Sequence, residues 1–415
     1  MRVYLLVLLV AALVTYLGTP LARWCALRWG AVTALRERDV HRVPTPRLGG
    51  MAMYAGMLAA VLVASRIPFL DRVFADPRPL VGILGGGALV CLLGVADDIW
   101  DLDWVTKLMG QVLAAGFLAW QGVQLYQLPL GGVTVGSSRM GTALTVLTVV
   151  VAMNAVNFVD GLDGLAAGVL AIGGTAYLLY TYRLTQDASP ADYSSLATLV
   201  VAVLVGACVG FLPHNFAPAR IFMGDSGSMV LGFVIAAAAI TVTGQIDPGS
   251  VTERQAFPAY LPMLLPVAVL VLPLLDMVLA VVRRVGAGRS PFHPDRMHLH
   301  HRLLGLGHTH RRAVLIMYIW TAVVSFGVAS LVVLPSGTAL VLLGVGLVAA
   351  AALTLGPLRP RGTAPLPVVT GAIPVVAVDR ARASAAVAPA DAPAVDPAVA
   401  PARTPAAGPR TPQAP

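Results

Sequence analysis

The sequence predicts an all-α protein that crosses a membrane many times. Of its 415 residues, 57% are hydrophobic and only 12% are charged, whereas soluble domains carry about twice that charge. The mean hydropathy is +0.80, and the apolar residues gather in long uncharged runs. These observations exclude a chain of ordinary soluble domains. The net charge of +8 reflects loop topology and anionic ligands rather than nucleic acid, so no nucleic-acid partner is expected.

Eleven apolar runs approach the ~20 residues that a membrane helix needs. They lie at 3–20, 48–65, 79–96, 106–121, 140–156, 164–182, 193–212, 226–243, 258–282, 313–333 and 337–356. After them, Ala and Pro dominate without a helical period, and frequent Pro forbids a packed helix. We therefore predict a transmembrane catalytic domain over 1–356 and a disordered cytoplasmic tail over 357–415.

The distribution of basic residues predicts the orientation of these helices. Loops after odd-numbered runs hold 15 Lys and Arg, whereas the N-terminus and the loops after even-numbered runs hold 7. Basic residues favour the cytoplasmic side of a membrane. The N-terminus is therefore expected outside and the C-terminus in the cytoplasm.

Charged residues that could carry chemistry follow the odd-numbered runs. Carboxylates inside or beside membrane helices are costly, and they indicate function by default. Four such clusters follow runs 3, 5, 7 and 9: Asp97-Asp98, Asn154 to Asp163 (with Asn157 and Asp160), Asp225, and His293 to Arg302. Each alone could be an ordinary polar turn. Because all four belong to odd-numbered loops, we expect them at one membrane face.

The ligand types in these clusters predict a hard cation. Carboxylate oxygens without thiolates favour Mg²⁺, with Mn²⁺ as an alternative, over zinc. Magnesium usually takes one or two carboxylates and leaves positions for substrate phosphates. Lys107 is the only lysine among 28 basic residues. Its position after Asp98 suggests a point charge for a phosphate, although a lysine at the membrane interface is an ordinary alternative.

The loop after run 9 is rich in histidine and arginine. Its sequence includes Arg296, His298, His300, His301 and Arg302. It could clamp a phosphate or sugar, bind zinc, or be an ordinary basic loop. Only two of its histidines, His298 and His301, share one face of a helix. The arginines at 283, 284, 311 and 312 are typical of interfacial anchors at helix ends.

Two further features lie beside these clusters. The turn that contains Arg47 and ends in Gly49-Gly50 opens run 2, and such a turn can present N–H groups to a phosphate. Asp276 lies within run 9, and an aspartate there needs a partner such as a histidine or arginine of the following loop.

Together these motifs resemble one family, the polyprenyl-phosphate N-acetylhexosamine-1-phosphate transferases. The matching segments cover about residues 1–356: Pro44 to Gly50, Gly94 to Asp98, Asn154 to Gly164, Phe222 to Ser228, and His298 to His301. In the histidine segment, Leu299 separates His298 from His300. That pattern is similar to the WecA/TagO-type branch, whereas the related MraY enzymes carry three adjacent histidines.

The resemblance implies a bacterial enzyme of the plasma (inner) membrane with its active site on the cytoplasmic face. It implies Mg²⁺-dependent transfer of GlcNAc-1-phosphate from UDP-GlcNAc to an undecaprenyl or decaprenyl phosphate, with release of UMP. The expected partners are these two substrates and membrane lipid, and a homodimer is compatible with the sequence. Catalytic roles are expected for Asp97, Asp98, Asp163 and Lys107, and metal ligation for Asp98 and Asp225. Substrate binding is expected for Arg47, Asn154, Asn157, Asp160, Arg296, His298, His300, His301 and Arg302.

Two alternatives stay open at this stage. The donor could be UDP-MurNAc-pentapeptide, which would make the protein a phospho-MurNAc-pentapeptide transferase of peptidoglycan synthesis. A secondary transporter would also have about eleven helices. However, transporter sites usually lie near the bilayer midplane, whereas these charges follow helix ends.

Overall fold

The computed structural model describes residues 1–32, 45–125, 137–188, 194–243, 256–288, 290 and 298–356. Contacts divide the chain into two units, Met1–Pro360 and Arg361–Pro415. All of the described residues belong to the first unit. The tail predicted over 357–415 lies outside them.

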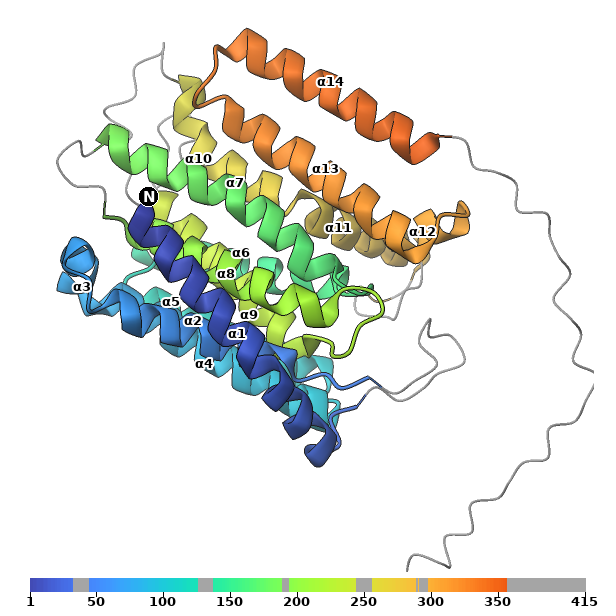
Figure 1. Ribbon diagram of the computed structural model, residues 1–415, viewed down its shortest axis with the longest axis horizontal. Coiled ribbons are helices and arrows are strands. Elements are labelled where there is room, and N and C mark those ends of the chain that lie inside the picture. The colour runs from blue at the N-terminus through green and yellow to red at the C-terminus, as the bar shows by residue number, and fades with distance from the viewer. Residues whose placement is uncertain are drawn as a thin grey trace, which may run out of the picture. The chain divides into compact units, whose positions relative to one another are not determined.

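The regular elements of the described residues are helices (Figure 1). In chain order they are α1 (Arg2–Trp29), α2 (Gly49–Ala64), the 3₁₀ helix η1 (Pro68–Leu70), α3 (Asp71–Ala75), α4 (Pro77–Trp100), α5 (Trp104–Trp120), α6 (Ser138–Val159), α7 (Leu165–Ala188), α8 (Leu196–Asn215), α9 (Gly224–Thr243), α10 (Ala256–Val269), α11 (Val271–Gly286), α12 (Leu299–Gly305), α13 (His310–Ser330) and α14 (Ser336–Leu355).

Eight of the described helices are long and apolar enough to cross a membrane. A ninth span results if α2 and the segment η1–α3, which are bent by 99° relative to each other, count as one. The predicted all-α, multi-spanning class is thus confirmed for the described part of the chain, whereas the count of eleven is not. The orientation stays a prediction.

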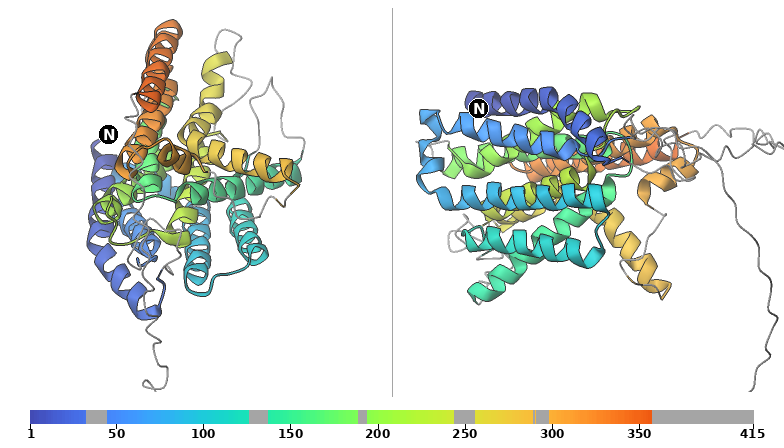
Figure 2. Two further views of the ribbon diagram at one scale, coloured as in Figure 1. Left: turned by 90° about the vertical axis from the view of Figure 1, so that its right-hand side faces the viewer. Right: turned by 90° about the horizontal axis from the view of Figure 1, so that it is seen from below.

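The run predicted as one span over 258–282 is broken into two helices. α10 ends at Val269 and α11 begins at Val271. Pro273 has no N–H to donate to the carbonyl of Val269, four residues earlier, which is a standard cause of a helix break. Figure 2 shows α11 leaving at a steep angle to α10.

The centre of the bundle is formed by α8 and α9, in which most residues are buried. α9 packs against α2, α4, α6 and α8, and α8 also packs against α1 and α7. By contrast, most of the apolar surface of α1 and α14 is exposed. Such exposed apolar faces are what lipid-contacting helices require, because lipid tails are as apolar as the side chains.

Glycines bring three helix ends into backbone contact beside the predicted clusters. A Cβ on Gly94 of α4 would lie 2.3 Å from the Cα of Ser226 in α9, and one on Gly50 of α2 would lie 2.1 Å from the nitrogen of Gly227. Small residues permit this close approach of membrane helices. As a result the last turn of α4 lies directly against the first turn of α9.

We expect Gly94→Ala to destabilise the protein by about 3 kcal/mol or more, because the added methyl meets backbone that cannot rotate away. Gly116→Ala is the matched control: on α5, a Cβ there meets nothing within 4 Å, and alanine should stabilise the helix by about 1 kcal/mol. Melting temperatures of the purified proteins in one detergent provide the comparison. Equal melting temperatures for the two variants would show that α4 and α9 are not in contact at Gly94.

Candidate active site

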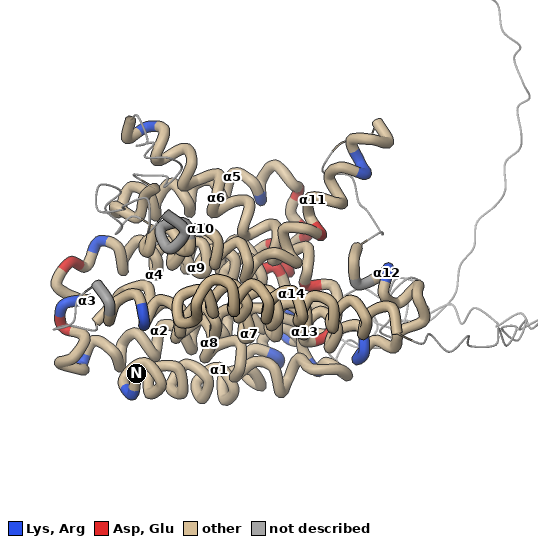
Figure 3. The backbone as a smooth tube through the Cα atoms, turned by 90° about the horizontal axis from the view of Figure 1, so that it is seen from above, with Lys and Arg blue, Asp and Glu red and all other residues tan. Residues whose placement is uncertain are grey.

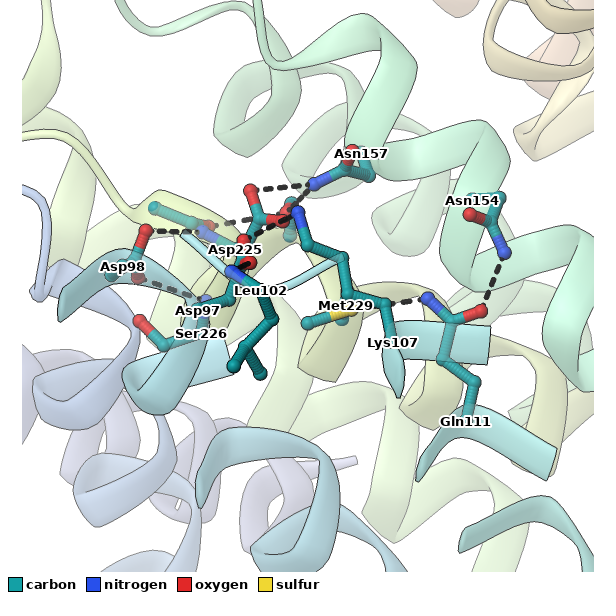
Figure 4. A network of polar contacts seen from close by, with 12 residues as sticks. Asp97, Asp98, Leu102, Lys107, Gln111, Asn154, Asn157, Asp225, Ser226 and Met229 are labelled. Atoms are coloured by element: carbon teal, nitrogen blue, oxygen red, sulfur yellow. Dashed lines mark hydrogen bonds and ion pairs between the residues drawn. The ribbon is translucent and has the colours of Figure 1, made fainter. Parts of the chain in front are cut away.

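Charged residues from α4, α5 and α9 meet at one end of the bundle, together with Asn157 of α6. Figure 3 shows that, apart from those beside α3, most acidic residues gather toward the end of the bundle that carries α12. Figure 4 shows the contacts among them in detail. Residues from three of the four predicted clusters therefore lie at this end, and the described part of the fourth, the histidine loop, is His298 and the start of α12.

Lys107 bridges two carboxylates from different helices. Its Nζ lies 2.6 Å from Asp97 Oδ2 and 3.1 Å from Asp225 Oδ2. The geometry arises from a tight turn: α4 ends before Asp101, which has φ 52°, and Asp103 caps α5 by accepting from Val105 N at 2.9 Å. Lys107, one turn into α5, is thereby brought beside the last turn of α4.

Asp98 binds the beginning of α9. Its Oδ1 accepts from Asp225 N at 3.1 Å, and its Oδ2 accepts from Ser226 N at 3.2 Å. Both amides belong to the first turn of a helix, where N–H groups have no intrahelical partner and the dipole favours an anion. Gly224 precedes them with φ 69°, and a Cβ there would lie 2.3 Å from Asp98. The Gly-Asp-Ser sequence thus fits the position of Asp98.

Asn157 of α6 holds the other side of Asp225. Its Nδ2 donates to Asp225 Oδ1 at 3.0 Å and to Ser228 Oγ at 3.0 Å. Both oxygens of Asp225 are therefore engaged, one by an amide and one by an ammonium group (Figure 4). Fixed donors on both oxygens hold this carboxylate in one orientation.

A second polar layer lies one turn deeper in the same three helices. Asn154 Nδ2 donates to Gln111 Oε1 at 2.7 Å, and Gln111 Nε2 lies 3.1 Å from Met229 Sδ. Asn154, expected to bind substrate, therefore joins helices α5 and α6 and lies apart from the carboxylate cluster (Figure 4). Sequence reasoning missed Gln111, although its spacing of four residues from Lys107 on one helix was a usable signal.

The turn between α6 and α7 carries Asp160 and Asp163. Burial, followed by the charge of the nearby Asp225, raises the pKa of Asp160 to about 8, and Arg47 acts in the opposite direction. Asp163 is buried, and its Oδ2 accepts from Ala219 N at 2.9 Å. This contact ties the turn to the segment between α8 and α9.

Asn215, at the end of α8, supports the same turn and was not predicted. Its Oδ1 accepts from Gly164 N at 3.0 Å, and its Nδ2 donates to Ile221 O at 3.0 Å. A single asparagine at the end of an apolar run gave no distinct signal.

The segment around Arg47 runs beside the segment that precedes α9. Phe222 N donates to Pro46 O at 2.8 Å, and Gly49 N donates to Phe222 O at 3.0 Å. The backbone amides of Gly49 and Gly50 are thus bonded to protein carbonyls. They are not directed at a ligand, as a phosphate-binding turn would require. Arg47 itself remains close enough to Asp160 to affect its pKa.

The histidine loop reaches the site through an aromatic contact. The ring of His298 meets that of Phe158 edge-on at 5.6 Å, and Phe158 follows Asn157 on α6. The rings of His298 and His301 lie 6.3 Å apart. Arg302 is exposed. Arg296 and the side chain of His300 lie outside the described parts of the structure.

Arg284 differs from the prediction of a membrane anchor. Only 7% of its surface is exposed, and its guanidinium lies 5.3 Å from the centre of the Phe158 ring. Arg284 and the buried Asp276 and Ala280 share one face of α11, because these positions are four residues apart. The face therefore turns inward, and Arg284 follows it instead of reaching lipid headgroups.

The donor set fits a magnesium ion that is shared with substrate. Within the described ranges, no three side chains among His, Cys, Asp and Glu are arranged to hold a metal alone. Asp97 and Asp225, however, converge on the same Lys107 ammonium. Two carboxylates are the usual protein contribution to a magnesium site in which phosphates supply further oxygens.

Comparison with known proteins identifies related sequences over most of the chain. The family model described as glycosyl transferase family 4 matches residues 80–243. The decaprenyl-phosphate N-acetylglucosaminephosphotransferase of Mycolicibacterium smegmatis is 46% identical over 370 residues, 87% of this chain and 90% of that protein. The probable undecaprenyl-phosphate N-acetylglucosaminyl 1-phosphate transferase of Bacillus subtilis is 31% identical, covering 80% and 84% respectively.

A relative whose name specifies a different sugar donor is also similar to this chain in sequence. The phospho-N-acetylmuramoyl-pentapeptide-transferase of Desulforudis audaxviator is 32% identical over 310 residues, 68% of this chain and 83% of that protein.

We expect Asp225→Asn to lower transferase turnover by about 100-fold or more, the scale of a lost preorganised electrostatic contact. Its melting temperature should fall modestly while the protein stays folded, because asparagine loses the ion pair with Lys107 and turns an amide donor toward the donor of Lys107 or Asn157. Asp101→Asn is the control: Asp101 is exposed, and asparagine tolerates its positive φ. Turnover and melting temperature are measured on the same preparations. Near-normal turnover of Asp225→Asn would remove Asp225 from the chemistry.

Proposed function

Because this chain belongs to the family of polyprenyl-phosphate N-acetylhexosamine-1-phosphate transferases, we propose that it transfers GlcNAc-1-phosphate from UDP-GlcNAc to a polyprenyl phosphate and releases UMP. The observation that supports this reaction most strongly is the cluster of Asp97, Lys107 and Asp225 at one end of an apolar bundle. There a lipid phosphate in the membrane and a soluble nucleotide sugar can meet.

The reaction exchanges one phosphoanhydride bond for another. An oxygen of the lipid phosphate attacks the phosphorus that bears the sugar, and the bond between that phosphorus and the bridging oxygen breaks, so the bridging oxygen leaves with UMP. A phosphate monoester is mostly dianionic at neutral pH, since its second pKa is about 6. The attacking group therefore needs little activation. The main task of the protein is to bring two polyanions together in line, which can contribute roughly 7–11 kcal/mol.

Lys107 and Mg²⁺ would both offset the negative charge of the substrate phosphates. Bound Mg²⁺ supplies positive charge to the phosphate oxygens. The residues that would hold it are Asp225 and Asp97, whose oxygens meet at Lys107. Asp98, expected as a ligand together with Asp225, is the less suitable donor, because both of its oxygens accept from amides of α9. If those carboxylates held the cation, the Lys107 ammonium would be a point charge for a phosphate.

Direct attack by the lipid phosphate is favoured over an aspartyl-phosphate intermediate. Asp98 accepts hydrogen bonds from two backbone amides of α9. Asp97 is paired with Lys107 and also accepts from Leu102 N at 2.9 Å. Carboxylates held by donors in this way are poorer nucleophiles than free ones, because the same lone pairs would have to attack phosphorus.

The proposed donor is UDP-GlcNAc. The relative at 46% identity is named for N-acetylglucosamine, and it is matched over more of this chain than the pentapeptide transferase at 32%. The histidine loop, with Leu299 between His298 and His300, supports the same branch. An imidazole can donate to a sugar hydroxyl, an acetamide oxygen or a phosphate.

The enzyme is proposed to lie in the bacterial plasma membrane with this site on the cytoplasmic face. That side carries the odd-numbered loops with their 15 basic residues. It is also the side on which nucleotide sugars are expected.

Purified protein with Mg²⁺ and one polyprenyl phosphate should release UMP from UDP-GlcNAc and largely ignore UDP-MurNAc-pentapeptide. Chelation of Mg²⁺ should abolish release, because the phosphate charge is then not neutralised. His298→Ala and His301→Ala should each lower kcat/KM by about 10- to 150-fold, the value of one charge-assisted hydrogen bond. A better rate with the pentapeptide donor would contradict the branch, and UMP release from neither donor would contradict the reaction.

The orientation can be tested by labelling single cysteines in intact cells with a reagent that does not cross membranes. Ser65 and Ser290 are exposed, and they lie in loops expected on opposite sides. In a Cys25→Ala background, with Cys91 and Cys208 buried, Ser65→Cys should react and Ser290→Cys should react only after lysis. The reverse pattern would invert the topology.

A further inference from the structure

We propose that Asp276 is a positioning residue that orients His298 and the start of α12 toward the nucleotide sugar. The inference rests on the proposed function for the identity of that ligand. The contact itself can be tested without it. Asp276 lies on α11, 22 positions before His298 in the sequence, and nothing in the reaction described above uses it.

One carboxylate holds both the backbone and the ring of the loop. Asp276 is fully buried. Its Oδ1 accepts from Leu299 N at 2.9 Å, and its Oδ2 lies 3.2 Å from His298 Nδ1. His298 makes no side-chain cap for α12. The Asp276 carboxylate of α11 instead accepts from Leu299 N, the first amide of α12. This hydrogen bond fixes the position at which α12 begins.

The ring of His298 is bounded on a second side by Phe158. The two rings meet at an interplanar angle of 64°. Because Asp276 faces Nδ1, the opposite nitrogen, Nε2, points away from α11. A carboxylate partner at one imidazole nitrogen commonly fixes the tautomer and leaves the other nitrogen for chemistry. Phe158 follows Asn157, which donates to Asp225. The His298 ring therefore contacts the same turn of α6 that binds the carboxylate cluster.

The burial of Asp276 argues against a role in simple packing. A buried carboxylate is costly unless it is hydrogen-bonded or paired, and its neighbours on the same face of α11 include Leu272 and Ala280. An apolar residue would fill this position at lower cost. The carboxylate is therefore best explained by what it holds, which is a histidine of the predicted substrate loop.

Hydrogen exchange tests the contact directly, with no substrate present. Asp276→Ala should increase exchange of the Leu299 amide at least about tenfold, because its acceptor is lost and the start of α12 can open. Asp276→Asn keeps an oxygen acceptor and should change the exchange little. Val278→Ala, on the exposed face of α11, is the control. Wild-type protection in Asp276→Ala would overturn the anchoring role.

Steady-state kinetics test whether Asp276 acts through His298. Asp276→Asn should lower kcat/KM for UDP-GlcNAc by about 10- to 100-fold, as for other carboxylates that orient a working histidine. In a His298→Ala background it should add less than about twofold, whereas its effect should be additive with His301→Ala. Additivity with His298→Ala would refute the proposal, and equal non-additivity with both histidines would indicate general collapse of the loop.

Failure of the transferase function and failure of the positioning role of Asp276 give different results. If the wild type releases no UMP, the proposed function is wrong, and amide exchange still decides whether Asp276 anchors α12. If the wild type is active but Asp276→Asn matches it, the positioning role is wrong and the transferase stands.

Discussion

The cost of keeping carboxylates inside an apolar bundle governs this structure. An unpaired carboxylate away from water is unfavourable by several kcal/mol, roughly, so each buried carboxylate must find a donor on another element. Asp97 finds it in Lys107 Nζ, Asp163 in Ala219 N, and Asp276 in Leu299 N. Each such bond also fixes the position of one chain segment relative to another. The same contacts that make the acids tolerable therefore assemble the site.

Close packing makes those bonds reachable. Asp98 can meet the first turn of α9 only because Gly94 and Ser226 are in backbone contact one turn away. The tight turn between α4 and α5 likewise places Lys107 against Asp97. Helix ends that are held this closely leave little freedom for the charged groups between them. A preorganised arrangement of that kind is what a transfer between two polyanions needs.

The sequence predicted the class of fold and much of the content of the site, because both depend on simple periodic and compositional signals. Long apolar runs predict membrane helices. The acidic clusters all follow odd-numbered runs, which predicts that they lie at one membrane face. Asp97, Lys107, Asn157 and Asp225 do meet. Other contacts depend on the rotation and depth of helices, which hydropathy does not encode. Asn154 therefore binds Gln111 instead of lying in the carboxylate cluster, and Asn215 was not predicted. Arg284, expected as an interfacial anchor, is buried. The break at Leu270 was hidden by the continuous hydrophobicity of 258–282.

The bridge formed by Lys107 has a consequence for electroneutrality. Asp97, Asp98 and Asp225 bring three negative charges when ionised and Lys107 brings one positive charge, so the cluster carries −2. One divalent cation cancels that charge and a second would exceed it. The negative charge of phosphate ligands would then have to be compensated from outside these four residues. Arg47, which acts on Asp160, and Arg284, over the Phe158 ring, are basic side chains of neighbouring segments. Under the proposed function, a single bound cation and these arginines would together balance the charge.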